Sequence, residues 1–479
     1  MQIASVNSYA SSNDNRQSVL SLLVGQHLSN RIFRAMTKND PHLFEATFKT
    51  RVEQFAEACV ACGKCYTACS ITSAAGIGGL DAEAVTTGVR DIFRSGKGSK
   101  ESERWAKACV LSGDCIKVCD YGVNPRLMLA MARMALSEES VDPDERKSQG
   151  ADAFKALGRG VKVLSQIQLT DQELRRLGQG PAVFREDEDE APDYIFYTGC
   201  NVLKTPHIAL LCLDIMDALD INYRVLGGPS HCCGILQYRA GDLATSNTMA
   251  RNTIEKFIRT GSSEVLSWCP TCQVQFSEIG LPTYEHATNT KPFEMTPFIL
   301  FLKRHLDQLR PLMTRRVEQR IALHLHPGVQ GVPEAAKRIL SAVPGVEFVN
   351  LNQPAIGLMS NALRTLPEFQ KELQLNELRA AEAAGIDALS AVYHADHREL
   401  CAHERDWPFR IINVLEIVGA SMGIYRDDYF KRLKLKQDTD AILNDCAEML
   451  ELHNIDKDQA RPVIEKAFLG EQPLPLRGS

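Results

Sequence analysis

Apolar and polar residues alternate in two different ways along the chain, and the change comes near residue 192. Before it, apolar residues recur at helical spacing, as at 44–58 and 125–136, which predicts helices joined by loops. After it, short apolar runs are followed by amphipathic stretches, a pattern typical of strands alternating with helices. The pattern therefore predicts an α+β protein of several domains, mostly helical in its first part.

Six short strands are expected in the second part, in two groups of three with the same alternation of strands and helices. The first group is 194–197, 223–226 and 264–268, and the second is 321–326, 346–350 and 388–393. We interpret the two groups as tandem copies of one α/β module. A polar stretch that includes the charge run 185–191 is expected to be a linker. The predicted units are a helical domain at 1–145, the polar linker at 146–192, α/β modules at 193–315 and 316–435, and a helical tail at 436–479.

The composition is that of a globular protein with proper cores, since 44% of the 479 residues are hydrophobic and 24% are charged. The formal charge of −6 is small and does not suggest binding to nucleic acid or to an anionic membrane. No apolar run approaches the roughly 20 residues that a bilayer span requires. The polar N-terminus argues against a secretory signal, so we expect a cytoplasmic protein that does not span a membrane.

Twelve of the 15 cysteines fall in two sets that carry motifs, seven between residues 59 and 119 and five between 200 and 272. Disulfides explain them poorly in a reducing compartment. Cys212, Cys401 and Cys446 lie outside any motif, and we expect them to be buried as small hydrophobic residues.

The first set opens with Cys59-x2-Cys62-x2-Cys65-x3-Cys69, which brings four thiols into one loop and the start of a helix. Such crowding suits a cubane iron–sulfur cluster, whose iron corners lie close together and each take one soft ligand. Zinc is the alternative, although zinc sites usually pair two neighbouring ligands with two distant ones.

The second motif, Cys109-x5-Cys115-x3-Cys119, has the same frame except that Ser112 stands where the second cysteine belongs. In two-motif ferredoxins the last cysteine of each motif binds the cluster of the other motif. By that rule one complete [4Fe–4S] site has four cysteine ligands and a second site has three. The four ligands of the complete site are Cys59, Cys62, Cys65 and Cys119, and the three ligands of the other site are Cys69, Cys109 and Cys115.

The five-residue gap resembles the iron–sulfur subunit of succinate dehydrogenase and fumarate reductase, in which it accompanies a [3Fe–4S] cluster. The resemblance implies a [3Fe–4S] cluster at the three-cysteine site. A second [4Fe–4S] cluster remains the alternative, with Ser112 Oγ, Asp114 or water on its fourth iron. Ser70 and Asp120 occupy the places where a proline commonly follows the last cysteine.

The second set, Cys200-x31-Cys232-Cys233-x35-Cys269-x2-Cys272, follows the ends of the first three predicted strands. Because ligands collect at the carboxyl ends of parallel strands, the five thiols are expected to meet at one place. The pattern resembles the cysteine-rich CCG domain. Together with the ferredoxin-type segment, residues 45–430 resemble a fusion of the C and B subunits of heterodisulfide reductase. The iron–sulfur subunits of glycolate, lactate and glycerol-3-phosphate oxidoreductases are similar.

This resemblance implies that the five cysteines bind one noncubane [4Fe–4S] cluster and form the catalytic site, where a disulfide is split by single-electron steps. Zinc on four of the five is an alternative, and a bare dithiol pair is another. The second module departs from the family, because the matching places hold other residues and predict no second cluster. Those residues are Gly328, Asn352, Gln353, His394 and His397. With His326, the two histidines could line a metal or proton-transfer site.

No dinucleotide fingerprint accompanies the cysteines, since the Gly-rich run at 76–79 follows a cysteine loop and lacks the required spacing. We therefore expect the flavin to sit on a separate FAD-containing subunit, among other electron-transfer subunits. The chain would pass electrons between that flavoprotein and the five-cysteine site, which acts on a disulfide or another sulfur substrate. Alternatives are a non-catalytic relay and a structural zinc-and-ferredoxin adaptor.

Overall fold

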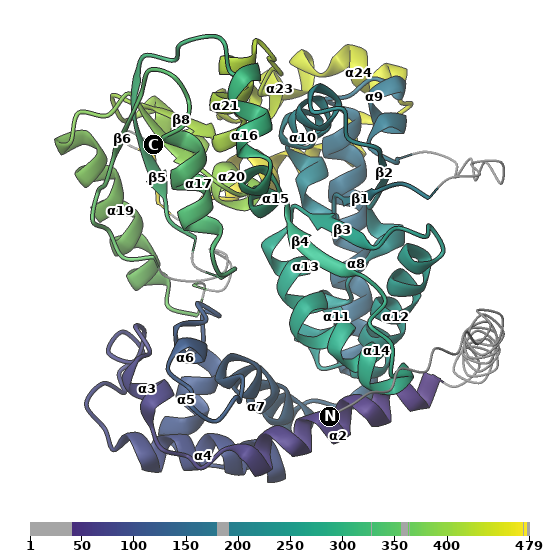
Figure 1. Ribbon diagram of the computed structural model, residues 1–479, viewed down its shortest axis with the longest axis vertical. Helices are drawn as coiled ribbons and strands as arrows, with labels where there is room; N and C mark the ends of the chain where they lie inside the picture. Colours follow the sequence, from purple (N-terminus) through teal and green to yellow (C-terminus); the bar gives the residue numbers. More distant parts are fainter. Residues whose placement is uncertain are drawn as a thin grey trace, which may run out of the picture.

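The helical first part lies at the bottom of the molecule in Figure 1. The computed structural model describes residues 41–179, 191–326, 328–355, 363, 365–472 and 474–476. Side chains cap the helices of this part at their first turns: Asp81 accepts hydrogen bonds from the backbone N–H groups of Glu83 and Ala84, and Asn124 accepts one from Leu127. The helices are α2 (Pro41–Ala58), α3 (Lys64–Thr67), α4 (Ala82–Ser95), α5 (Lys100–Ala108), α6 (Asp114–Lys117) and α7 (Pro125–Ser140).

The first α/β unit is a four-stranded parallel sheet in the order β2-β1-β3-β4. Tyr197 at the end of β1 pairs with Leu226 on β2 and with Ser267 on β3, so the three strands end at one edge. The strands are β1 (Tyr194–Tyr197), β2 (Tyr223–Leu226), β3 (Glu264–Ser267) and β4 (Glu294–Pro297). The helices are α10 (Pro206–Ala218), α11 (Ile235–Ala240), α12 (Leu243–Ile258), α13 (Pro270–Val274), α14 (Leu281–Thr288) and α15 (Phe298–Arg304), with a π-helical turn at Gln275–Gly280 after α13 and short 3₁₀ turns at Asn201–Lys204 and Pro229–His231.

The second α/β unit repeats this order as β6-β5-β7-β8, again with all strands parallel. The strands are β5 (Gln319–His324), β6 (Val346–Val349), β7 (Ala388–Ala391) and β8 (Arg410–Asn413). The helices are α16 (Leu306–Leu309), α17 (Val332–Leu340), α19 (Pro367–Ala383), α20 (His394–Leu400) and α21 (Val414–Met422), with 3₁₀ turns at Arg310–Leu312 and Cys401–Arg405. One hydrophobic core joins the two units, because α10 and α15 of the first pack with α17 and α21 of the second.

The expected polar linker is largely helical in the structure. Helix α8 (Pro143–Gln166) and helix α9 (Asp171–Arg176) occupy most of 146–179, and the charge run at 185–191 lies almost wholly outside the described residues. The α8 sequence appears polar because its buried apolar residues are confined to its last turns. The first half of α8 packs closely on α11, since a Cβ on Gly150 would lie 3.3 Å from Gln237 Cα.

The expected helical tail follows α22 (Tyr429–Lys434) and packs back on α8. Its buried Ile464 and Phe468 share a core with Val163 and Leu164 of α8. The tail contains α23 (Thr439–Asp445), α24 (Ala447–Leu452), α25 (Lys457–Ile464) and a π-helical turn at Glu465–Gly470.

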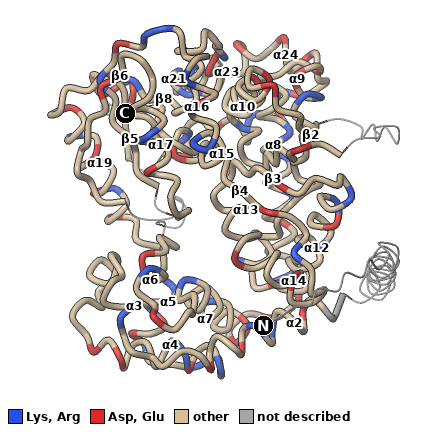
Figure 2. Tube along the Cα trace, viewed as in Figure 1, with Lys and Arg blue, Asp and Glu red and all other residues tan. Residues whose placement is uncertain are grey.

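Charged residues of both signs are interspersed over the whole molecule (Figure 2), in keeping with the small net charge. Among the described residues, no helix combines the length and the apolar character needed to cross a membrane. Cys212, Cys401 and Cys446 are buried in the α/β cores, as expected.

Candidate metal centres

The two ferredoxin-type motifs fold into two loops of the same shape. In the first, Ala61 and Gly63 have positive φ angles of 56° and 75°, and the chain then enters α3. A side chain at Gly63 would lie 2.6 Å from Ala82 Cβ, so this place requires glycine. The loop thereby turns Cys62 and Cys65 toward Cys59, which follows α2 directly.

The second loop repeats these torsion angles, with φ of 62° at Leu111 and 83° at Gly113, before the chain enters α6. Ser112 therefore stands at the same point of its loop as Cys62 does in the first. α3 and α6 pack against each other. The two motifs with matching cysteine spacing therefore form loops of the same backbone conformation.

The seven thiols fall into two neighbouring groups. Cys59, Cys62, Cys65 and Cys119 line one pocket together with Val60, Ala61 and Trp105. The remaining three, Cys69, Cys109 and Cys115, lie together beyond it. Burial raises the pKa of the Cys115 thiol, and the nearby Cys109, Cys65 and Cys69 raise it further, so the two groups adjoin. Trp105 joins the groups, because its Nε1 donates a hydrogen bond of 3.4 Å to Cys69 Sγ.

The five cysteines of the second set meet at the carboxyl edge of the first sheet, and all are buried. Their sulfur atoms form one continuous chain of contacts in the order Cys200, Cys232, Cys233, Cys272, Cys269. The Sγ atoms of Cys233 and Cys272 lie 3.5 Å apart. The backbone leaves no spare room there, since a Cβ on Gly199 would lie 3.4 Å from Cys272 Sγ.

The surroundings of this group favour thiolates at two positions. Hydrogen bonds from Cys200 and Cys233 lower the pKa of Cys232 to about 4, and the Gly234 N–H, 3.4 Å from its sulfur, acts in the same direction. A hydrogen bond from Cys272 holds the pKa of Cys269 well below its ordinary value. Buried thiolates need a compensating cation. Five clustered soft donors therefore fit a thiophilic metal group.

Three side chains near these sulfurs were not predicted from the sequence. Tyr197 Oη lies 3.6 Å from Cys272 Sγ, and Arg239 interacts electrostatically with Cys233, Cys269 and Cys272. His394, at the start of α20, faces Cys269 and lowers the pKa of its thiol, while neither of its own ring nitrogens has a hydrogen-bond partner among the described residues. Tyr197 and Arg239 carry no sequence signal, whereas His394 was expected only as a replaced ligand and as part of a possible metal or proton-transfer site.

The three histidines considered as one metal or proton-transfer site lie in three different environments. His394 faces Cys269, and His326 Nδ1 pairs with Asp396 Oδ2 at 2.9 Å. His397 Nε2 lies 2.6 Å from Asp428 Oδ2. Within the described residues, no group of metal-ligating side chains contains all three.

Comparison with known proteins identifies the middle of the chain. The family model of the CCG cysteine-rich domain matches residues 194–277, from β1 to the π-helical turn, and this span contains all five clustered cysteines. These residues form a CCG domain.

Relatives that cover two thirds to three quarters of this chain point the same way. The D subunit of the dihydromethanophenazine:CoB–CoM heterodisulfide reductase of Methanosarcina barkeri is 24% identical over 398 residues, covering 77% of this chain and 94% of that protein. Its counterpart from Methanosarcina mazei is 23% identical, covering 66% of this chain and 78% of that protein. The B subunit of the fumarate reductase (CoM/CoB) of Methanothermobacter marburgensis is 22% identical, covering 67% and 62%. The resemblance to heterodisulfide reductase subunits is confirmed.

The first α/β unit contacts the ferredoxin-type segment through Arg51 on α2 and the buried Arg126 on α7. Arg51 donates hydrogen bonds to Thr283 Oγ1, at 2.8 Å, and to the Ile279 carbonyl oxygen, at 3.2 Å. Arg126 on α7 forms an ion pair with Glu278 of the CCG side and donates hydrogen bonds to the carbonyl oxygens of Leu111, at 3.1 Å, and Gly328, at 2.8 Å. Asn124 also donates a hydrogen bond of 2.9 Å to Glu278. The second cysteine loop, the CCG domain and the second sheet unit thus meet at this arginine.

Proposed function

We propose that the chain is an iron–sulfur electron-transfer subunit that carries three clusters in series. The first is a [4Fe–4S] cluster on Cys59, Cys62, Cys65 and Cys119, a proposal supported by the pocket that these four residues line together. The second is a [3Fe–4S] cluster on Cys69, Cys109 and Cys115, with a second [4Fe–4S] cluster as the alternative. Bound clusters would supply one-electron redox chemistry.

The third is a noncubane [4Fe–4S] cluster on the five CCG cysteines. The unbroken contact of five buried sulfurs supports this ligand set, because four iron atoms with five thiolate donors require something other than an ordinary cubane. Zinc on four of the cysteines is the alternative. A zinc site would leave one thiol without a metal.

A short route connects the three sites. Trp105 lines the first site and donates its hydrogen bond to Cys69 of the second. Leu111, within the second cysteine loop, and Val274 both pack against Ala395. These two residues adjoin the third site, since Val274 follows Cys272 by two positions in the chain. The proposal that electrons pass through all three clusters rests on these contacts between consecutive sites, and not on any single site.

We further propose that the CCG site is catalytic and acts on a disulfide or another sulfur substrate. A pocket of about 250 Å³ reaches Cys232 from the surface and is lined by Lys256 and Arg259. These cations would attract an anionic substrate to the sulfur whose thiolate form is favoured. The alternative is a non-catalytic relay, which the burial of the five sulfurs favours.

Residues 316–435 are proposed to be a second CCG repeat without a cluster, supported by the shared strand order of the two sheets. Cys269 follows the end of β3 by two residues, and Tyr393 follows the end of β7 by two. Counted in this way, Tyr393 and Asp396 correspond to Cys269 and Cys272. The counterparts thus lie one residue before the expected His394 and His397.

At this carboxyl edge of the second sheet, polar side chains surround a small pocket of about 50 Å³. It is lined by His324, His326, Glu377 and Asp396, among others. Imidazole and carboxylate groups thus take the place that thiols hold in the first unit. This supports a repeat in which the cluster ligands have been replaced.

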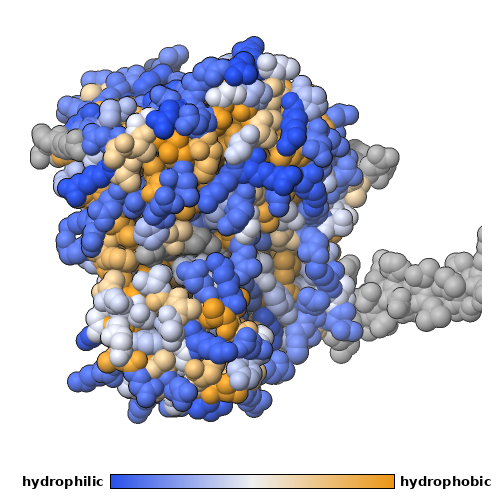
Figure 3. Space-filling view, turned by 60° about the vertical axis from the view of Figure 1, so that its left-hand side comes forward, coloured by the Kyte–Doolittle hydropathy of each residue, from blue (hydrophilic) through white to orange (hydrophobic). Residues whose placement is uncertain are grey.

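A flavoprotein subunit is the proposed electron partner. Apolar side chains are exposed beside the first cluster site, including Val60 and Tyr121, at 52% and 51% exposure. Orange atoms interrupt the blue surface on the lower part of the molecule, which contains the ferredoxin-type segment (Figure 3). An apolar, cluster-bearing surface suits docking of another electron-transfer subunit.

The test is anaerobic quantification of iron, acid-labile sulfide and zinc with paramagnetic resonance, applied to Cys233→Ala and to Cys212→Ala as a matched control. Cys233→Ala should lose about four irons per chain and the signal of the third cluster, while the ferredoxin-type signals persist. Cys212→Ala should lose none.

Unchanged iron and sulfide in Cys233→Ala contradict the noncubane assignment, and zinc in place of the missing iron supports the alternative. A change of the CCG signal on adding a thiol or disulfide distinguishes catalysis from relay.

A further inference from the structure

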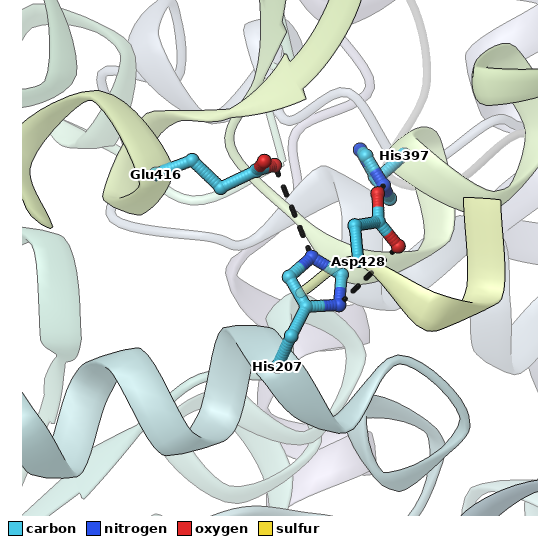
Figure 4. Close-up of side chains that lie close together, drawn as sticks. All are labelled: His207, His397, Glu416 and Asp428. Atoms are coloured by element: carbon cyan, nitrogen blue, oxygen red, sulfur yellow. Dashed lines mark hydrogen bonds and ion pairs between the residues drawn. The ribbon is translucent and has the colours of Figure 1, made fainter. Parts of the chain in front are cut away.

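Four side chains from four different elements converge at a place outside all cysteine motifs (Figure 4). His207 is on α10 of the CCG domain, His397 on α20 and Glu416 on α21, and Asp428 caps α22. Each offers one nitrogen or oxygen atom, and these four atoms lie within 4.8 Å of one another. Zinc ligands at 2.0–2.2 Å from the metal lie roughly 3.3–3.5 Å apart in a tetrahedron, so small side-chain movements would close the group around an ion.

His207 has no partner that explains its position. It is 3% exposed, and neither of its ring nitrogens makes a hydrogen bond within the described part of the chain. Its Nδ1 lies 3.5 Å from Asp428 Oδ1 and its Nε2 lies 3.9 Å from Glu416 Oε1, both too far or too poorly aligned for a hydrogen bond. A buried, unpartnered imidazole between two carboxylates is a costly arrangement without a ligand.

The donor atoms of the group face one another at short range. Asp428 Oδ2 lies 2.6 Å from His397 Nε2, and Asp428 Oδ1 lies 3.5 Å from His207 Nδ1. Imidazole nitrogens and carboxylate oxygens are both donors that a divalent transition metal accepts. The Nζ of Lys431 contacts Glu404 at 2.9 Å and the Ile411 carbonyl oxygen at 3.0 Å.

An ion could reach the group from solvent. A pocket of about 400 Å³ opens on this side of the molecule, and Glu416 and Asp428 form part of its wall. The two histidines lie behind these carboxylates, buried at 3% and 0% exposure. The site therefore has the access path that metal binding needs.

We propose that His207, His397, Glu416 and Asp428 bind one divalent transition-metal ion, Zn²⁺ being the ion that two imidazoles and two carboxylates suit best. The ion would tie α10 of the CCG domain to three elements of the second α/β unit and so act as a structural clamp between the two. It is distinct from the cysteine sites, because all of its donors are nitrogen or oxygen, and it does not depend on which cluster they hold.

The experiment measures zinc per chain in anaerobically purified full-length protein and records its zinc-edge X-ray absorption. We expect about one zinc, with nitrogen and oxygen neighbours at about 2.0–2.2 Å and no sulfur at about 2.3 Å. His207→Gln and His397→Gln should lose the zinc while keeping the iron, the sulfide and the cluster signals. Added Zn²⁺ should raise the melting temperature of the zinc-depleted wild-type chain but not of these variants.

Glu416→Gln is the variant that best preserves the local structure, because an amide oxygen can still accept the hydrogen bond that Glu416 takes from the Asn413 N–H. Asp428→Asn keeps an acceptor for the Lys431 N–H but also alters the 2.6 Å contact with His397. Loss of zinc from Glu416→Gln therefore reports the ligand role. His305→Gln, remote from the group, should keep its zinc. Absence of zinc from the wild type, a sulfur shell around it, or its retention in His397→Gln would overturn the proposal.

Discussion

Ser112 is the one residue at which the two cysteine loops differ in their metal-binding capacity. Because its loop repeats the torsion angles around Cys62, a cysteine there would point its sulfur toward the site of Cys69, Cys109 and Cys115. We expect Ser112→Cys to convert a [3Fe–4S] centre into a [4Fe–4S] centre, adding about one iron per chain and removing the signal of the oxidised three-iron cluster. Anaerobic iron analysis and paramagnetic resonance measure both.

Ser73→Cys adds an exposed thiol nearby, outside the ligand positions, and serves as the control. It should leave iron and spectrum unchanged. If Ser112→Cys has no more effect than this control, the second site already holds four irons, and the oxygen-capped alternative is correct.

His324 should make the stability of the second unit depend on pH. Its Nδ1 lies 2.6 Å from Glu377 Oε2; burial lowers its pKa, but Glu377 together with Asp396 and Glu399 raises it to about 9. Since an unfolded histidine has a pKa of about 6.5, the protonated ring stabilises the fold, fully below pH 6.5 and progressively less as pH rises through 9. The side chain is 21% exposed, so we expect a loss of about 1–3 kcal/mol. Anaerobic denaturation at pH 6 and pH 9.5 measures it, and a parallel loss in His324→Gln contradicts it.

At the scale of elements, the first three strands were predicted within one residue of β1, β2 and β3, because each is an apolar run that ends at a cysteine loop. β5, β6 and β7 were placed as well, although β5 begins and ends two residues earlier than expected. β4 and β8 were missed. The β4 sequence Glu-Met-Thr-Pro resembles a turn, and both are edge strands defined by pairing with β3 and β7. The histidine and carboxylate group could not be foreseen, because its members are distant in sequence and meet only through the packing of α10 on α21.

The junction at Arg126 should govern how firmly the ferredoxin-type segment is held to the CCG domain. The Arg126 side chain is 5% exposed. Arg126→Met would remove the ion pair of Glu278, which keeps its hydrogen bond from Asn124, and the donor to the carbonyl oxygens of Leu111 and Gly328. We expect the free energy of unfolding to fall by about 3–5 kcal/mol. Electron transfer from the second to the third cluster should also slow, because the Leu111 contact loosens. Anaerobic urea denaturation and rapid-mixing reduction measure the two effects.

Lys117→Met is the matched control, because Lys117 pairs with Asp114 at 3.1 Å on the surface. Its loss should cost no more than about 1 kcal/mol. Equal destabilisation by the two substitutions would show that the junction is not a special contact.

At the scale of the whole molecule, the three cysteine sites lie at increasing depth. Cys62 at the first proposed site is exposed. At the second, Cys69 is half-buried while Cys109 and Cys115 are buried, and the five CCG cysteines are at most 6% exposed. Depth protects clusters from solvent and from oxygen, whereas exposure allows exchange of electrons with a partner. The gradient therefore favours entry or exit of electrons at the first site and chemistry at the third.

This arrangement predicts that exposed apolar residues beside the first site are needed for partner binding and not for folding. We expect Val60→Asp combined with Tyr121→Asp to abolish co-purification of a flavin-containing subunit with the tagged chain from its native host. Flavin released on denaturation of the purified complex measures this. Leu452→Asp is the control, because Leu452 is 56% exposed on α24. Cluster content and reduction by dithionite should be equal in all three proteins, since no ligand changes. If the double variant still co-purifies with flavin, the partner binds at a different surface. If the wild-type complex contains no flavin, the proposal of a flavoprotein partner is wrong.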